Sequence, residues 1–188
     1  MLFIISAPSG AGKTTIIKEL FKASPGLKFS VSATTRAKRA GEQNGKDYYF
    51  LTDAEFDEKL SNNEFVEWEN VHGNRYGTLK SEVEKYINSP IHIVFDVDVK
   101  GALSIKKLFP DAIMIFINVH EEQLLSRLHK RNTETEEQIN KRIDRIAIEI
   151  KEKDKFDHIV DNSNKPVGLQ KAVSELKEII NKYSNGEK

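Results

Sequence analysis

Short runs of apolar and β-branched residues recur along the chain, separated by longer segments of mixed polarity. Continuous runs of this kind are typical of parallel strands that are covered on both faces of a sheet. They predict strands over residues 2–6, 91–96, 112–118 and 158–160. The middle two are continuous apolar or β-branched runs and fit this pattern best.

Between these runs, apolar residues recur every three or four positions, which predicts helices with one buried face. The predicted helices cover residues 14–23, 99–109, 121–130 and 136–153, and a last helix opens at Pro166. Strands that alternate with helices indicate an α/β fold, in which helices cover both faces of a parallel sheet in three layers.

Residues 29–88 interrupt this alternation. They contain short segments of alternating polarity, at 48–51 and 65–70, which predict further strands. Thr52 and Glu55 have the spacing of a capping box, which predicts the start of a helix. We therefore expect an inserted α+β lobe on the α/β core.

The chain has 188 residues, enough for one compact domain with a substantial core. Its 29 basic side chains are balanced by 29 acidic ones, which argues against a polybasic protein that coats nucleic acid. The absence of cysteine excludes disulfides, thiolate metal sites and a cysteine nucleophile. No apolar run approaches the ~20 residues of a membrane helix, so we expect a cytoplasmic protein with no membrane partner.

The first predicted strand leads into Ala7-Pro8-Ser9-Gly10-Ala11-Gly12-Lys13-Thr14, and a helix follows. This order is the context of a Walker A phosphate-binding loop. Its glycines let main-chain N–H groups turn toward phosphate oxygens, its lysine adds a mobile cation, and its threonine hydroxyl can ligate Mg²⁺. Ala7 replaces the first glycine of the motif, so its φ should be negative. The residues expected to bind a nucleoside triphosphate are Ser9, Gly10, Ala11, Gly12, Lys13, Thr14 and Thr15.

The predicted strand at 91–96 ends in a carboxylate, as a Walker B strand does. Ligands of open α/β sheets bind at that edge. We expect Asp96 or Asp98 to hold Mg²⁺ or its water shell. The alternative is that a carboxylate here only caps the next helix.

Two arginines and several hydroxyl groups gather in residues 30–42. Arg36 and Arg39 are three positions apart and can fork onto one phosphate. Tyr48 and Tyr76 can add phenolic donors. The alternative is a solvated basic loop.

The spacing Thr34-Thr35-Arg36-x-x-Arg39-x-x-Glu42-x-x-Gly45-x-x-Tyr48-x-Phe50-Leu51 resembles the signature of guanylate kinases. The likeness continues through residues 64–68, 73–78, 96–101 and 131–135, and so covers nearly the whole chain. It implies a P-loop kinase core that binds ATP, an inserted lobe that binds GMP and a helical lid. On this basis the core comprises residues 1–28, 89–124 and 152–183, the lobe 29–88, the lid 125–151 and a polar tail 184–188.

The resemblance also implies roles for single residues in binding GMP. The phosphate would be held by Arg36, Arg39, Tyr48 and Tyr76, the guanine would be read by Ser32, Glu67 and Thr78, and Asp98 would lie near the acceptor phosphate. A carboxylate at Glu67 can accept from the adjacent N1–H and N2–H₂ donors of guanine, while Ser32 and Thr78 can donate to O6 or N7. Adenine lacks both donors, and sites of this kind discriminate by ~10⁴ or more. The lone tryptophan, Trp68, adjoins Glu67, so we expect its fluorescence to report GMP binding.

Residues 125–142 are predicted to form a helix, a hydrophilic turn and a second helix, with a capping-box spacing at Thr135 and Gln138. Arg127, Arg131 and Arg142 could converge there on ATP phosphates. The alternative is a salt-bridged hairpin, because acidic residues interleave with these arginines.

In phosphoryl transfer the protein mainly positions the reactants and neutralises charge. The residues expected to act in transfer are Lys13, Arg36, Arg131 and Arg142, with Mg²⁺ as cofactor. Arg36 and Arg39 would align the GMP oxygen that attacks the γ-phosphoryl group in line.

The predicted function is Mg²⁺-dependent transfer from ATP to GMP, with dGMP as a further candidate acceptor. Three residues depart from the usual guanylate kinase pattern: Asn132 in place of glycine, Lys38 in place of proline, and Asp161 in place of an asparagine near adenine. Because of Asp161, the sequence defines the preference for ATP as donor less well than the preference for GMP as acceptor. The alternatives are a phosphopeptide-binding module of the same fold and a kinase for another nucleoside monophosphate.

Overall fold

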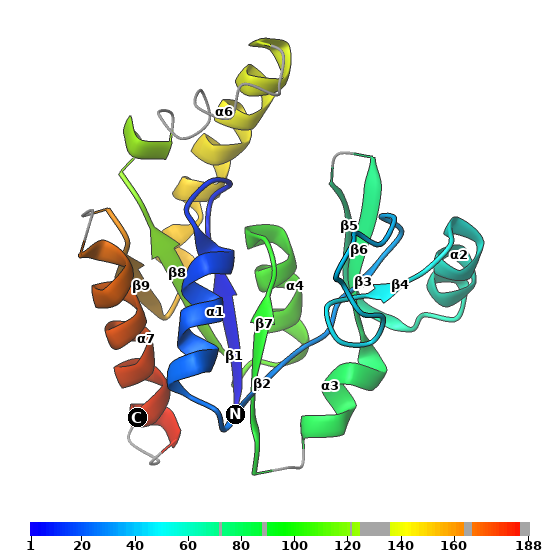
Figure 1. Ribbon diagram of the computed structural model, residues 1–188, viewed down its shortest axis with the longest axis horizontal. Coiled ribbons are helices and arrows are strands. Elements are labelled where there is room, and N and C mark those ends of the chain that lie inside the picture. The colour runs from blue at the N-terminus through cyan, green and yellow to red at the C-terminus, as the bar shows by residue number, and fades with distance from the viewer. Residues whose placement is uncertain (72, 88–89, 121, 125–135, 164–166, 185–188) are drawn as a thin grey trace.

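The computed structural model describes residues 1–71, 73–87, 90–120, 122–124, 136–163 and 167–184. At its centre is a five-stranded sheet with the order β2-β7-β1-β8-β9 (Figure 1). The strands are β1 (Leu2–Ser6), β2 (Leu27–Phe29), β7 (His92–Asp96), β8 (Ile113–Asn118) and β9 (His158–Asp161). All neighbouring strands in this sheet are parallel, as the unbroken apolar runs predict.

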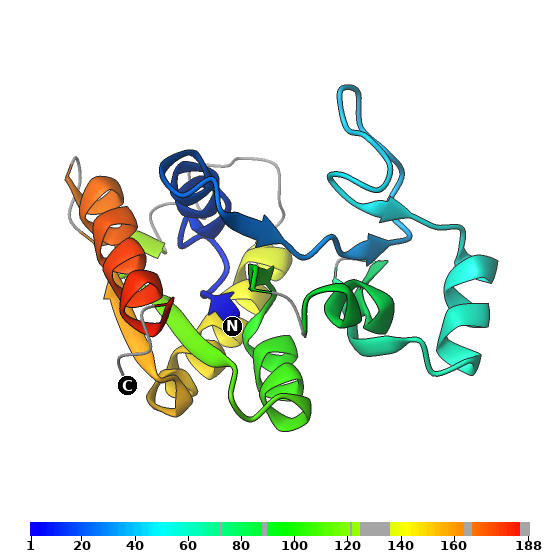
Figure 2. The ribbon, with the colours of Figure 1, turned by 90° about the horizontal axis from the view of Figure 1, so that it is seen from below.

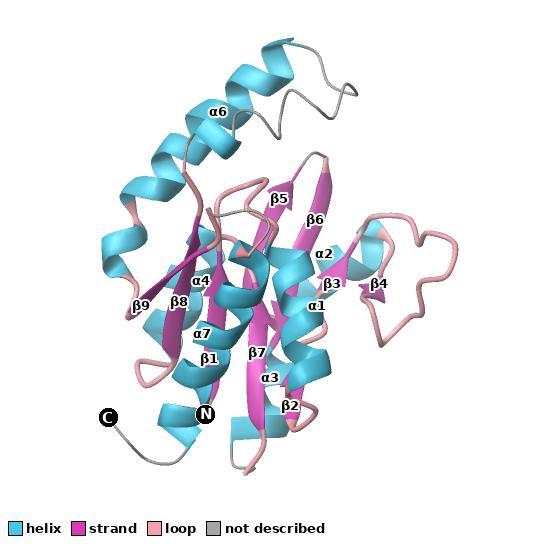
Figure 3. Ribbon diagram, turned by 60° about the vertical axis from the view of Figure 1, so that its left-hand side comes forward, coloured by secondary structure: helices cyan, strands magenta, loops and turns pink. Residues whose placement is uncertain are grey.

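Helices cover both faces of this sheet (Figure 3). Helices α1 (Lys13–Ala23) and α7 (Gly168–Ser184) share one apolar cluster, in which Leu20 and Leu176 are fully buried. Helix α4 (Val99–Leu108) lies against the other face, where Phe95 and Ile105 are fully buried. The prediction of a three-layer α/β core is confirmed.

A smaller lobe stands beside the core (Figure 2). Its mixed sheet has the order β4-β3-β6-β5. The elements of the lobe are β3 (Ala33–Thr34), β4 (Tyr49–Phe50), α2 (Asp53–Ser61), β5 (Phe65–Val71), β6 (Asn74–Leu79) and α3 (Lys80–Ile87). Phe56 of α2 stacks on Phe65 of β5 with ring centroids 4.4 Å apart, so the lobe has a small apolar core of its own.

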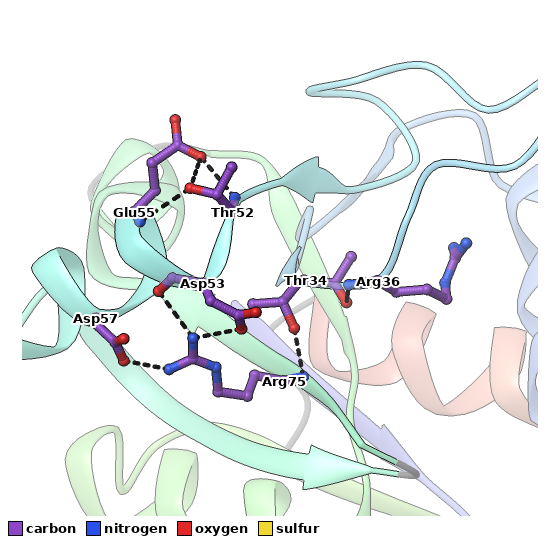
Figure 4. Close-up of polar contacts among 8 residues, drawn as sticks. Thr34, Arg36, Thr52, Asp53, Glu55, Asp57 and Arg75 are labelled. Carbon is purple, nitrogen blue, oxygen red and sulfur yellow. Dashed lines mark hydrogen bonds and ion pairs between the residues drawn. The ribbon is translucent and has the colours of Figure 1, made fainter.

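Two polar networks hold α2 in place (Figure 4). Thr52 Oγ1 accepts from the Glu55 N–H at 3.2 Å, and Glu55 Oε2 accepts from the Thr52 N–H at 2.6 Å. The predicted capping box is therefore present. From β6, Arg75 donates to Asp53 Oδ1 at 2.7 Å and also to the Asp57 carboxylate, which ties the helix to the sheet.

Helix α6 (Glu136–Lys151) extends past the carboxyl ends of the core strands, on the side where the loop after β1 lies (Figure 1). Its Ile146 is buried in the same cluster as α1 and α7. A 3₁₀ turn, η1 (Lys153–Lys155), then leads into β9. One end of α6 thus belongs to the core, while the rest stands over the carboxyl edge of the sheet.

Several predicted boundaries shift by one or two residues. The helix predicted to end at 153 stops at Lys151, and β2 reaches Phe29, one residue past the expected end of the first core segment. Ser184, assigned to the polar tail, is the last residue of α7, and its hydroxyl donates to the Ile180 carbonyl at 2.7 Å. Of the helix predicted at 121–130, the structure describes only residues 122–124, which are helical. Pro166 and the capping box at Thr135 lie outside the described residues.

Among the residues that the structure describes, no helix is both long enough and apolar enough to cross a membrane.

Candidate active site

The phosphate-binding loop joins β1 to α1. Gly10 and Gly12 both have a φ of 87°, which glycine adopts without steric cost. Among the described residues other than glycine, only Asn63 has a positive φ. Ala7 therefore has the negative φ that was predicted. The loop ends at the N-terminus of α1, where main-chain N–H groups and the helix dipole favour phosphate oxygens.

Lys13 begins α1 and reaches the end of β7. Its Nζ lies 2.7 Å from Asp96 Oδ1 and also donates to the Val97 carbonyl. The exposed Thr14 follows it and adds a hydroxyl. Mg²⁺ prefers hard oxygen ligands and commonly takes one or two from protein, with water and phosphate oxygens filling its other positions. Thr14 and Asp96 fit that pattern, although no described cluster of three or more acidic or histidine side chains could hold a metal ion by itself.

A cavity of about 570 Å³ lies over the loop. Helix α6 closes one side of it, because Arg142 Nη2 donates to Ser9 Oγ at 2.8 Å. From the same helix, Glu149 Oε2 accepts from the Ser9 N–H at 3.2 Å, and burial raises the pKa of Glu149. Two side chains of α6 therefore hold the phosphate-binding loop.

A second cavity, of about 220 Å³, is lined by both the core and the lobe. Its lining includes Phe29, Ser32, Tyr48, Glu67, Glu69, Tyr76 and Asp96. Three residues line both cavities: Lys13, Val71 and Asp98. A group bound in one cavity can therefore lie next to a group bound in the other.

Glu67 on β5 is oriented by β6. The Thr78 hydroxyl donates to Glu67 Oε1 at 2.7 Å, and Thr78 is fully buried. Burial also raises the pKa of Glu67. The other oxygen, Oε2, lies over the first turn of α4, where a methyl group on Gly101 would be 3.0 Å from it. Thr78 was expected to donate to the base, and in this structure its hydroxyl proton is donated to Glu67.

Asp98 contacts both the start of α4 and helix α6. Its Oδ1 accepts from the Gly101 N–H at 2.8 Å, so the helix-cap alternative holds for this carboxylate. Its Oδ2 accepts from Arg145 Nη2 at 2.7 Å. Burial, together with the neighbouring Asp98 carboxylate, raises the pKa of Glu69 to about 7. The point where the cavities meet is thus rich in carboxylates.

In the basic segment, residues 30–42, both arginines contact Glu42. Arg36 Nη2 donates to Glu42 Oε1 at 2.7 Å, and this hydrogen bond raises the pKa of Arg36. The Arg36 guanidinium lies 5.4 Å from the Tyr48 ring centroid, and the Tyr48 and Tyr76 rings are 6.0 Å apart. The structure therefore brings these three predicted residues together. Arg39 is exposed, and its main-chain N–H donates to Glu42 Oε2 at 2.8 Å.

The sequence model of the guanylate kinase family matches residues 1–183. The chain belongs to the guanylate kinase family. The guanylate kinase of Thermotoga maritima is 45% identical over 174 residues, which are 92% of this chain and 84% of that protein. The guanylate kinase of Fusobacterium nucleatum is 41% identical over 180 residues, 95% of each chain.

A solved structure agrees with these relatives. The crystal structure of guanylate kinase from Anaplasma phagocytophilum matches with a TM-score of 0.77 at 25% identity. The match covers 98% of this chain and 86% of that one. The chain is therefore a kinase with the guanylate kinase fold.

Some residues predicted from the guanylate kinase resemblance are not described. Arg127, Arg131 and Asn132 lie outside the described residues. Asp161, which stands where an asparagine was expected, ends β9. The next residue, Asn162, is buried and donates from Nδ2 to the Ala11 carbonyl at 2.9 Å, so an amide at this strand end holds the phosphate-binding loop.

Sequence reasoning missed three charged residues of this guanylate kinase site: Glu69, Arg145 and Glu149. Arg145 and Glu149 follow Arg142 at helical spacing, which places all three on neighbouring positions of one α6 face. That spacing was visible in the sequence. Glu69 is two positions after Glu67 in a strand, so both carboxylates face the same side, a second signal that could have been used.

Proposed function

We propose that this chain transfers the γ-phosphoryl group of ATP to GMP, giving ADP and GDP, with Mg²⁺ as cofactor and dGMP as a further acceptor. The observation that carries the proposal is that two cavities meet at Lys13, Val71 and Asp98. One of them contains the phosphate-binding loop, and the other contains a partly buried carboxylate, Glu67. Membership of the guanylate kinase family supports ATP as donor and GMP as acceptor.

Guanine is read in the cavity that contains Glu67. With Oε1 held by Thr78, the carboxylate keeps lone pairs for the N1–H and N2–H₂ donors of guanine. Ser32 donates to O6 or N7 from the same lining, and Phe29 and Val71 supply apolar contacts for the flat base. Adenine has neither donor, so Glu67 would keep its bond from Thr78 but gain none from the base, which is costly for a partly buried carboxylate.

The GMP phosphate is bound by the basic segment. Arg36, Tyr48 and Tyr76 already lie together, and Arg39 joins them when the segment closes on the phosphate. Arg36 then exchanges Glu42 for a phosphate oxygen. Asp98 lies near the acceptor phosphate, and its other oxygen caps the start of α4.

The ATP phosphates are bound by residues 9–15 of the loop. Lys13 and Arg142 neutralise the charge of the transferred group, since both already reach the loop cavity. Mg²⁺ held by Thr14 and Asp96 supplies further positive charge for the phosphate oxygens. Arg127 and Arg131 stay predictions for the same role. No general base is needed, because the attacking phosphate oxygen is already ionised.

We further propose that the chain works as three parts: a core of residues 1–28, 89–124 and 152–183, a GMP-binding lobe of residues 29–88, and a lid of residues 125–151. Closure of the lobe and lid over both nucleotides excludes water, which would otherwise hydrolyse ATP. The contacts of α6 with Ser9 support a lid that acts directly on the phosphate-binding loop.

The test is a product assay with ATP, Mg²⁺ and one acceptor at a time: GMP, dGMP, AMP or UMP. We expect GDP from GMP, with ADP formed in equal amount, and little product from AMP or UMP. Equal turnover of AMP and GMP, or none with GMP, contradicts the proposal. Omission of Mg²⁺ should abolish turnover. Full activity without it would show that the reaction does not require the metal.

A further inference from the structure

Arg145 joins three separate segments of the chain at the point where the two cavities meet. Its Nη2 lies 2.7 Å from Asp98 Oδ2, at the start of α4, and 3.2 Å from Glu69 Oε2 on β5. Its Nε lies 3.0 Å from Glu149 Oε1, one turn further along α6. One guanidinium therefore links the lid helix to the core and to the lobe.

Residues close to Arg145 on α6 and to Glu69 on β5 line the two cavities in which we propose that the nucleotides bind. On α6, Arg142 and Glu149 lie one turn before and after Arg145, and both hold Ser9 of the phosphate-binding loop. On β5, Glu69 is two positions after Glu67 and points to the same side of the strand. A shift of α6 relative to β5 would thus change the distance between the ATP phosphates and the guanine site.

We propose that Arg145 is a positioning residue that couples the ATP site to the GMP site by fixing α6 against β5 and the start of α4. The inference rests on the proposed reaction of ATP with GMP. Arg145 lines the cavity over the phosphate-binding loop, but we assign it no contact with the transferred group. It acts through Glu69 and Asp98 on the acceptor side and through its own helix on the donor side.

The chemistry of the contact suits an arginine. A planar guanidinium can donate to several carboxylates at once from fixed directions, whereas a lysine ammonium is a compact charge on a flexible stem. Removal of Arg145 would leave Glu69, Asp98 and Glu149 close together without this cation. The contact that joins α6 to β5 and to the start of α4 would then be lost, so the lobe and α6 should move apart.

The experiment compares substrate coupling in the wild-type chain and in variants. For each protein, the Kd of GMP is measured with and without a non-transferable ATP analogue and Mg²⁺, and kcat is measured with ATP and GMP. In the wild type we expect the analogue to tighten GMP binding. In Arg145→Ala we expect this ratio to fall toward unity, and kcat to fall by about tenfold to a hundredfold, the usual effect of a small misplacement of reactants.

Four further variants separate coupling from folding. Arg145→Lys keeps the charge and should fold, but should restore only part of the coupling. Glu69→Ala should also lower the coupling, and the double variant Glu69→Ala with Arg145→Ala should be no more impaired than Arg145→Ala alone, because both changes break one contact. Lys151→Ala removes an exposed cation near the end of the same helix and should change neither kcat nor the coupling by more than about twofold.

The inference is overturned if Arg145→Ala and Arg145→Lys keep the wild-type coupling and kcat, if the effects of Glu69→Ala and Arg145→Ala add, or if the wild type turns over GMP with no coupling between the nucleotides. Failure of the proposed function looks different, since the wild-type chain would then form no GDP from ATP and GMP.

Discussion

The Nζ atom of Lys13, on the first residue of α1, lies 2.7 Å from Oδ1 of Asp96, on the last residue of β7. This ion pair joins the phosphate-binding loop to the strand end beside the second cavity. Both residues line that cavity, and Lys13 also lines the cavity over the loop. The lysine ammonium is therefore held where the two cavities meet, which is where the proposed transfer would take place.

Lys13→Ala should abolish most of the activity while the fold is retained. Cations that stabilise the charge of phosphoryl transfer contribute about 10³-fold or more to kcat, so we expect a loss of that order. Steady-state kinetics with ATP and GMP measures it. Lys18→Ala, an exposed lysine of the same helix, is the matched control and should keep normal kcat. A loss of less than about tenfold in Lys13→Ala would remove this residue from the chemistry.

Gly101→Ala should weaken GMP binding without weakening the fold. The added methyl group would lie 3.0 Å from Glu67 Oε2 and 3.2 Å from Asp98 Oδ1, so Glu67 must shift. Alanine is favoured over glycine in a helix by about 1 kcal/mol, which offsets the crowding. We expect the KM for GMP to rise by about tenfold, with little change in the KM for ATP.

The control for this substitution is Gly26→Ala, where a methyl group would have no neighbour within 4 Å and φ is not positive. It should leave both KM values unchanged. A normal KM for GMP in Gly101→Ala would mean that the position of Glu67 does not govern acceptor binding.

Glu69→Gln should change how stability depends on pH. The pKa of Glu69 is raised from 4.5 to about 7, so the native chain binds more protons than the unfolded chain between these values. The free energy of unfolding of the wild type therefore falls as pH rises through this window, and the glutamine variant lacks that fall. The variant should gain about 1–2 kcal/mol relative to wild type between about pH 5 and pH 8, with allowance for solvent screening.

Urea unfolding at the two pH values measures this difference. Glu84→Gln, on the exposed side of α3, corrects for the loss of one negative charge. If the free-energy difference between Glu69→Gln and wild type is the same at both pH values, the carboxylate does not have a raised pKa in the native chain.

The core and the phosphate-binding loop could be predicted because their signals are local. Unbroken apolar runs mark β1, β7 and β8, and the glycine spacing of the loop is contiguous in sequence. Strands β2 and β3 have only three and two residues, which is too short for a periodic pattern. They become strands because tertiary pairing with β7 and β6 fixes them.

The parts of the site that the sequence did not predict depend on contacts between distant segments. Arg145 meets Glu69 across 76 positions, and nothing near either residue indicates the partner. Trp68 shows that a residue adjacent in sequence to the site need not face it. It adjoins Glu67 in sequence, but side chains alternate along a strand, and its ring packs on Phe56 of α2 with centroids 6.2 Å apart. Its fluorescence should therefore report the outer side of the lobe and respond weakly to GMP.

The most direct test of the central claim is the ratio of kcat/KM for GMP to that for AMP, measured in the wild type and in Glu67→Ala. Because a partly buried carboxylate that reads N1–H and N2–H₂ rejects a base without them, we expect a wild-type ratio of about 10⁴ or more. In Glu67→Ala the ratio should fall by about 10² or more, mainly through lost activity with GMP. A wild-type ratio below about ten, or an unchanged ratio in the variant, would contradict the account of Glu67 as the residue that selects guanine.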